Sequence, residues 1–216
     1  MGSGATTSMV SVGGSRSRFC NWVSPYLPLP MRAEWHGKGG SKEWAAPASV
    51  PARRLVAPAV VLDFSSQAAE NPDFLLEVEH IEEWQTTHGP IPEGGWLLYR
   101  TGWDVRSASQ QDFINADDTG PHTPGISPAC ARWLGEKAPV IGLGVETVGT
   151  DAGAAHSFDP PFPCHAALMG SGKYGLTQLQ NLAQLPPTGI VLVAAPLPIV
   201  SGSGSPSRVL ALVDRG

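Results

Sequence analysis

The sequence predicts an α/β fold with one mixed β-sheet and short flanking helices, and three observations predict it. Near-continuous apolar runs of strand length, rich in β-branched residues, recur along the chain and are typical of buried strands. Amphipathic helical stretches lie between several of these runs, and this alternation defines the α/β class. Gly (25) and Pro (21) together exceed a fifth of the 216 residues. Helices should therefore be few and short, and shaped turns should join them.

The first half of the ordered chain begins with the apolar run LVAPAVVLDFS, a predicted buried strand. Residues 80–87 are predicted to be helical, because Ile81 and Trp84 lie three positions apart and share one face. A Gly-Pro pair at residues 89 and 90 ends this helix. The predicted strands of this half span residues 55–65, 75–78 and 94–103.

The second half continues the alternation. Ser127 is a good N-cap and Pro128 a good first-turn residue, so a helix is predicted directly after them. Leucines recur at three-residue steps over residues 175–185, which predicts a further helix. The predicted strands of this half span residues 138–149, 188–200 and 206–213. No internal repeat or second domain is indicated.

Charge and cysteine content exclude several classes of protein. The formal net charge is −5 and no stripe of Lys and Arg is present, so nucleic-acid binding is not expected. No apolar run approaches the roughly 20 residues of a membrane span, so no membrane partner is expected. Cys20, Cys130 and Cys164 are widely spaced and form no CxxC pair. This pattern favours a reducing compartment, and we expect a cytoplasmic protein.

Residues 1–49 differ from the rest of the chain. They contain no acidic residue before Glu34 and are rich in Ser and Gly. An Arg- and Ser-rich, acid-free start is typical of organellar targeting peptides, but the glycines interrupt the amphipathic pattern that such peptides need. A poorly ordered or wrongly assigned start is the favoured alternative. We therefore divide the chain into an atypical segment, 1–49, and a folded α/β domain, 50–216.

Two familiar loop motifs are incomplete. The run GLGVETVG has glycines at 142, 144 and 149, but the third is misplaced for a dinucleotide turn and no helix follows. The run GSGKYG lacks the earlier Gly and the Ser/Thr of a phosphate loop. The serine-rich stretch 201–208 lies between two predicted strands and has no G-x-S-x-G spacing, so a hairpin turn is expected there.

The stretch GTDAGAAHSFDPPFPCHAALMG, residues 149–170, gathers possible metal ligands at Asp151, His156, Asp159 and His165. A histidine in a loop is most often a hydrogen-bonding surface residue, and that interpretation stays open for each. His165 differs because it precedes the apolar AALMG. An imidazole at the edge of a core needs a partner for each nitrogen, which a metal and an acceptor would supply.

From Val50 onward the chain resembles the cyclase family, which includes bacterial kynurenine formamidases and isatin hydrolases. The resemblance rests on VPARRLVAPAVVLDFS, IPEGGWLLYRTGWD, GPHTPGISPACARWL, ETVGTDAG, HAALMG and LPPTGIVLVAAPLPIVSGSGSPSRVLALV. It implies a swivelling-type β/β/α domain that forms a homodimer or homotetramer. It also implies hydrolysis of a small-molecule amide with Zn or Mn as the metal.

Carried over residue by residue, the resemblance gives an incomplete site. His165 matches the later histidine of the family, with Leu168 in the H-x-x-L position, and is the predicted catalytic and metal-binding residue. The family's helical glutamate falls on Thr177. The N-terminal H-x-G-T-H-x-D-x-P-x-H motif is absent, and only Glu34 and His36 lie near its expected place. Asp151 and His156 are expected to shape the loop.

Two further residues are predicted to bind substrate. Trp103 and His122 come from segments that, by resemblance, lie toward the family's pocket, where an aromatic wall suits a planar substrate. The alternative is that Trp103 closes a strand end and His122 caps a turn. The predicted function is metal-dependent hydrolysis of the arylformamidase (kynurenine formamidase) type, linked to tryptophan catabolism and impaired by the missing ligands. The alternative is a non-catalytic homologue that acts by association.

Overall fold

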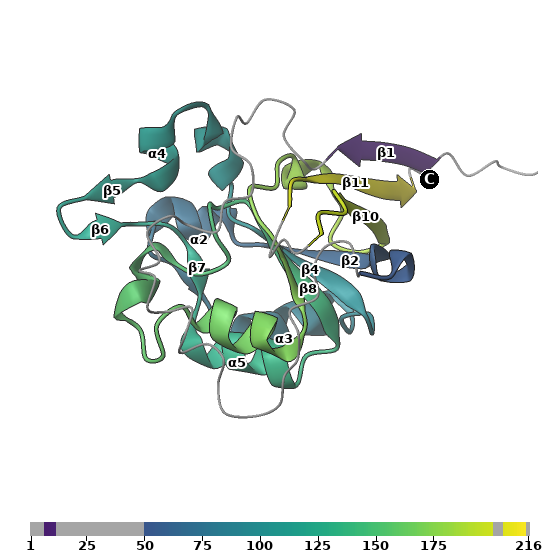
Figure 1. Ribbon diagram of the computed structural model, residues 1–216, viewed down its shortest axis with the longest axis horizontal. Helices are drawn as coiled ribbons and strands as arrows, with labels where there is room; N and C mark the ends of the chain where they lie inside the picture. Colours follow the sequence, from purple (N-terminus) through teal and green to yellow (C-terminus); the bar gives the residue numbers. More distant parts are fainter. Residues whose placement is uncertain (1–6, 12–49, 201–204, 215–216) are drawn as a thin grey trace, which may run out of the picture.

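The computed structural model describes residues 7–11, 50–200 and 205–214, and a seven-stranded sheet runs through it (Figure 1). The strand order is β1-β11-β10-β2-β4-β8-β9. Strands β2, β4, β8 and β9 run parallel, whereas β10 is antiparallel to both neighbours and β1 is antiparallel to β11. The strands span β1 Thr7–Ser11, β2 Val56–Asp63, β4 Gly95–Arg100, β8 Val140–Val145, β9 Tyr174–Leu176, β10 Ile190–Pro196 and β11 Ser207–Asp214.

The helices are short, as the Gly and Pro content predicts. They span α2 Ser65–Glu70, α3 Val78–His88, α4 Gln110–Ile114 and α5 Pro128–Glu136. Helices α3 and α5 lie together on one side of the sheet, and the small β5–β6 hairpin projects from the opposite end of the molecule to β1 and β11 (Figure 1). The remaining strands span β3 Leu75–Leu76, β5 Ala116–Asp117, β6 Gly120–Pro121 and β7 Gly125–Ile126. No helix in the described ranges is long and apolar enough to cross a membrane.

The central strands are buried on both faces, which explains why they are apolar without alternation. In β2, Val60 and Leu62 enter a core shared with α3 and α5. The neighbouring Ala59 and Val61 point the other way, into a second core with β10 and β11. A two-layer arrangement of helices against a mixed sheet confirms the predicted α/β class.

Most predicted elements are confirmed, including the α5 cap, where Ser127 Oγ accepts a hydrogen bond from Cys130 N at 3.2 Å. The helix predicted over residues 175–185 is wrong. That stretch holds β9 and a short 3₁₀ turn, Leu182–Gln184. Gln178 and Asn181 adopt positive φ, 59° and 64°, which interrupts any helix. The leucines of this stretch reach the second core from β9, from the irregular segment after it and from the 3₁₀ turn.

Part of the atypical segment 1–49 is described. Residues 7–11 form β1, which pairs with β11 from Thr7↔Asp214 to Ser11↔Leu210. Residues 12–49, including Glu34 and His36, lie outside the described ranges. The division at residue 49 stays a prediction.

Candidate active site

His165 and Asp151 form a dyad beyond the carboxyl end of β8. His165 lies in a π-helical turn, Cys164–Leu168, that packs against α5, and single π turns are frequent at functional sites. Its Nδ1 contacts Asp151 Oδ2, and Asp151 is only 7% exposed. Two backbone groups hold the same carboxylate: Cys164 N donates to Oδ1 at 2.6 Å and His165 N to Oδ2 at 3.3 Å.

This geometry assigns different tasks to the two nitrogens of His165. A carboxylate only accepts hydrogen bonds, so the neutral imidazole places its proton on Nδ1 and its lone pair on Nε2. The buried carboxylate also stabilises the imidazolium that forms when Nε2 takes up a proton. The dyad can therefore act as a base or present Nε2 to a metal.

Close backbone packing fixes the loop that carries Asp151. A Cβ on Gly125 of β7 would lie 2.2 Å from Ala152 N, and one on Gly153 would lie 2.2 Å from Pro121 O. Gly153 N donates to Thr123 O at 3.0 Å. Glycine at these positions lets two chain segments touch, so the Asp151 backbone has little room to shift.

Glu146 is a second buried carboxylate, at the carboxyl ends of β4 and β8. It is 1% exposed, and its Oε2 accepts hydrogen bonds from Thr101 N at 2.7 Å and Trp103 N at 3.2 Å. Between these donors Gly102 adopts φ 70°, so the turn wraps around the carboxylate as an anion-binding nest. Burial raises the pKa of Glu146. Its Oε1 is buried without a hydrogen-bond partner in the described part of the chain.

The motifs in the sequence do not single out Glu146, because the glycines of GLGVETVG are the part that resembles a known loop. The available signal was a charged residue placed directly after a fully apolar strand. A carboxylate at that position must find donors, and the next parallel strand's end is the nearest source.

Trp103 is buried and fully engaged in packing. It begins a 3₁₀ helix, Trp103–Ala108, and is 2% exposed. Its Nε1 donates to Phe113 O at 2.8 Å, and the Arg106 guanidinium lies 4.0 Å from the ring centroid. The structure thus places Trp103 under the loop next to Glu146, and its predicted substrate contact stays a prediction.

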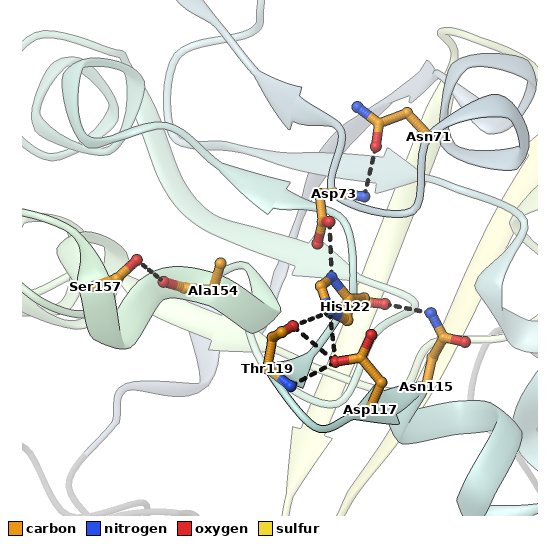
Figure 2. A network of polar contacts seen from close by, with 8 residues as sticks. All are labelled: Asn71, Asp73, Asn115, Asp117, Thr119, His122, Ala154 and Ser157. Atoms are coloured by element: carbon orange, nitrogen blue, oxygen red, sulfur yellow. Dashed lines mark hydrogen bonds and ion pairs between the residues drawn. The ribbon is translucent and has the colours of Figure 1, made fainter.

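His122 lies between two carboxylates (Figure 2). Its Nδ1 is 2.7 Å from Asp73 Oδ2, and its Nε2 is 3.1 Å from Asp117 Oδ1 and 2.9 Å from Thr119 Oγ1. These contacts join the β5–β6 hairpin to the turn before β3. Hydrogen bonds to Asp73 and then to Asp117 raise the pKa of His122. Binding a substrate through this imidazole would require one contact to open, and that role stays a prediction.

Because His122 has a raised pKa in the folded chain, its contribution to stability is pH-dependent. The stabilisation is fully present below the ordinary histidine value of 6.5 and is lost as pH rises through the raised folded pKa. We expect the gap in unfolding free energy between wild type and His122→Gln to narrow from pH 6 to pH 9 in urea melts. His156→Gln, outside this network, is the control. If the difference in unfolding free energy stayed constant over that pH range, His122 would not be held in its charged form by Asp73 and Asp117.

The contribution of Asp117, the partner of His122, to stability depends on pH in the opposite direction. Hydrogen bonds from Thr119 lower its pKa to about 2. Its contribution is present above the ordinary aspartate value of 3.8 and is lost as pH falls toward 2. The charged contacts of His122 with Asp73 and Asp117 are therefore all present only above the pH range in which Asp117 takes up a proton and below the range in which His122 loses one.

The described residues supply only part of a metal site. Within these ranges no group of three or more His, Cys, Asp and Glu side chains is placed to hold a metal ion. His165 is paired with Asp151, while Thr177 follows β9 in extended chain. Asp151, expected to shape the loop, also orients the imidazole.

Comparison with known proteins assigns the family. The model of the family described as "Putative cyclase" matches residues 31–152, more than half of the chain. The chain therefore belongs to the cyclase family. It is similar to the isatin hydrolase of Roseibium aggregatum, with 46% identity over 163 residues, which cover 76% of this chain and 62% of that protein. The chain thus spans less than two thirds of this relative's length.

Solved structures agree. Isatin hydrolase A from Labrenzia aggregata, bound to benzyl benzoate, is 49% identical and superimposes with a TM-score of 0.77 over 80% of this chain and 67% of that one. Isatin hydrolase A from Ralstonia solanacearum is 34% identical, with a TM-score of 0.77 over 97% of this chain and 82% of that one. The resemblance read from the sequence is confirmed, and the relatives named are isatin hydrolases.

Proposed function

We propose that this chain is a hydrolase that opens the cyclic amide of an isatin-type lactam, with His165 and Asp151 as its acid–base pair. The dyad carries the proposal, because a buried carboxylate oriented on an imidazole serves proton transfer. Similarity to isatin hydrolases favours the lactam over the N-formylaniline expected from the sequence. Both substrates place an acyl group on an aniline nitrogen, so the chemistry is shared.

The reaction divides into two proton transfers. His165 Nε2 accepts a proton from water as the water oxygen attacks the amide carbonyl, and Asp151 stabilises the resulting imidazolium. The C–N bond then breaks, and the imidazolium returns the proton to the leaving aniline nitrogen. The carboxylic acid that forms releases its remaining proton to solvent, so the products are a carboxylate, an aromatic amine and one proton, and atoms and charges balance.

A metal enters as an expectation from the family resemblance, with Zn or Mn as the candidates. Catalytic zinc takes three protein ligands and an open position. The described residues hold no such group, so they do not by themselves fit a catalytic metal. Additional ligands would come from residues outside the described ranges, where Glu34 and His36 lie, or from a second copy.

A second candidate function is a non-catalytic homologue that acts by association. The absence of the H-x-G-T-H-x-D-x-P-x-H motif from the sequence favours it. The two candidates differ in turnover and in metal content.

The test uses the full chain. Metal content is measured by mass spectrometry after purification, and hydrolysis of isatin and N-formylkynurenine is followed with added Mn²⁺ or Zn²⁺. We expect about one metal per chain and isatin turnover that falls about 10³-fold or more in His165→Ala. His156→Ala is the control. If only N-formylkynurenine were hydrolysed, the substrate would be an arylformamide. If neither compound were hydrolysed, the result would favour the non-catalytic homologue.

A further inference from the structure

Helix α5 contacts both segments that carry the His165–Asp151 dyad. At its start, Ser127 caps the helix two residues after Gly125, and a Cβ on Gly125 would lie 2.2 Å from Ala152 N. The backbone beside Asp151 is therefore packed against the chain that leads into α5. At its end, α5 packs against the π turn that carries His165. One helix thus connects the two halves of the dyad.

Gly135, in the last turn of α5, lets the backbone of the helix touch the backbone of the π turn. It is buried, and a Cβ added there would lie 2.5 Å from Ala167 O and 2.8 Å from Ala167 C. Carbon atoms in ordinary contact lie about 3.5–4.0 Å apart, so both distances are prohibitively short. Ser171 Oγ donates to the same carbonyl oxygen at 2.7 Å. The distance between α5 and the π turn at this point therefore depends on glycine.

Lys173 connects the chain after the π turn to the same end of α5. Its ammonium donates to Leu134 O and, at 2.8 Å, to Ala138 O. Carbonyls in the last turn of a helix lack donors within the helix, and the helix dipole favours a cation there. Lys173 N also donates at 3.4 Å to Leu168 O, at the end of the π turn. One residue therefore joins the helix end to the turn that carries His165.

Asp151 takes its position from a different set of contacts. Gly153 N donates to Thr123 O at 3.0 Å, which connects the loop of Asp151 to the chain before α5. The carboxylate then meets the π turn through Cys164 N, His165 N and His165 Nδ1. Hydrogen bonds weaken steeply when their angles are distorted, so these contacts require the π turn to lie at one height along α5.

We propose that Lys173 and Gly135 are positioning residues for the dyad. They hold the π turn at the height along α5 at which His165 Nδ1 meets Asp151. Their effect on turnover rests on the function proposed above, whereas their effect on the contact between the imidazole and the carboxylate does not. A displacement of about 1 Å in a reacting group can lower a rate about 10²-fold. Small shifts of the π turn should therefore lower turnover even in a chain that stays folded.

The first test compares two lysines at the same end of α5. Lys173→Met removes the ammonium and keeps a flexible apolar side chain. Lys137→Met is the matched control, because Lys137 is exposed and follows α5 directly. In the full chain, Lys173→Met should lower kcat for isatin about 10- to 100-fold and change KM less than about threefold. An equal loss in the control, or a rise in KM alone, overturns the role of Lys173.

The second test adds one methyl group. Gly135→Ala places a Cβ against Ala167 and should lower kcat about 100-fold, although alanine is the better helix former. Gly170→Ala is the matched control. Gly170 lies in the 3₁₀ turn after the π turn, Met169–Ser171, and a Cβ there meets no other described segment within 4 Å. If Gly135→Ala kept full activity, its close contact with the π turn would not position His165.

A spectroscopic measurement on the full chain without substrate separates positioning from turnover. A hydrogen bond to a carboxylate is charge-assisted and strong, so the proton between His165 Nδ1 and Asp151 should give a downfield NMR resonance. His165→Gln, which lacks this proton, assigns the resonance. The resonance should shift or disappear in Lys173→Met and Gly135→Ala and stay unchanged in both controls. Circular dichroism checks that each variant folds.

The two measurements distinguish the proposals. A shifted resonance in both test variants would support positioning even if the chain did not hydrolyse isatin, which would contradict only the proposed function. A resonance that is absent from wild type, or is unchanged in both test variants, overturns the positioning proposal whatever the turnover.

Discussion

Replacing Asp151 with asparagine is expected to lower kcat/KM for the lactam by about 10³- to 10⁴-fold while the chain stays folded. The asparagine oxygen can still accept the hydrogen bond from Cys164 N, which keeps the loop in place. Its amide nitrogen, however, is a donor and faces His165 Nδ1. The imidazole must then accept at Nδ1 and carry its proton on Nε2. The wrong tautomer leaves no lone pair on the nitrogen that should act on water.

The loss of activity in Asp151→Asn should come from the changed tautomer of His165 and not from the lost charge. Asp112→Asn, on the exposed side of α4, changes the same charge without touching the dyad and should keep full activity. Asp151→Asn should lower kcat with little change in KM, because the defect concerns proton transfer and not substrate binding. If instead KM alone rises, Asp151 serves the shape of the binding loop and the dyad assignment is wrong.

Replacing Glu146 with alanine is expected to lower the free energy of unfolding by about 3–5 kcal/mol, the largest stability effect we expect. The carboxylate accepts from Thr101 N and Trp103 N inside the protein. Each buried donor left without an acceptor costs about 1–3 kcal/mol, and the missing side chain leaves a cavity. Urea denaturation of the two chains measures the difference.

Glutamine at position 146 separates charge from hydrogen bonding. It keeps a carbonyl oxygen for the same donors, so Glu146→Gln should cost only about 1 kcal/mol. Burial raises the pKa of Glu146, so ionising it in the folded chain opposes folding as pH rises above its ordinary value of 4.5. The stability of Glu146→Gln relative to wild type should therefore improve from pH 4 to pH 7. If the difference in stability between the variant and wild type did not change with pH, burial would not raise the free energy of ionising this carboxylate.

The sequence was sufficient for the elements that follow a simple period. Strand β2 is an unbroken apolar run, and α5 carries its own start signal in Ser127 and Pro128. The leucines of 175–185 have a helical period but reach the core from a strand and a short 3₁₀ turn, because Gln178 and Asn181 turn the backbone through positive φ. Asn181 is a weak signal for such a turn, because asparagine tolerates positive φ, but Gln178 gives no such signal.

The candidate site was predictable only in part, because its contacts join distant segments. His165 was identified from its apolar neighbours and its family context, but its pairing with Asp151 depends on the π turn at Cys164. His122 meets Asp73 across 49 positions of sequence, and no local pattern indicates that contact. The hydrogen bonds of Glu146 could be predicted only if β4 and β8 were known to be neighbouring strands.

The contacts of Gly125 and Gly153 make residues 121–125 and 151–153 a single mechanical unit. The first segment is also the one anchored through His122. A side chain added at either glycine would clash with the backbone of the other segment, so the two segments should change together in evolution. Both segments should therefore show little variation and be inherited as a block.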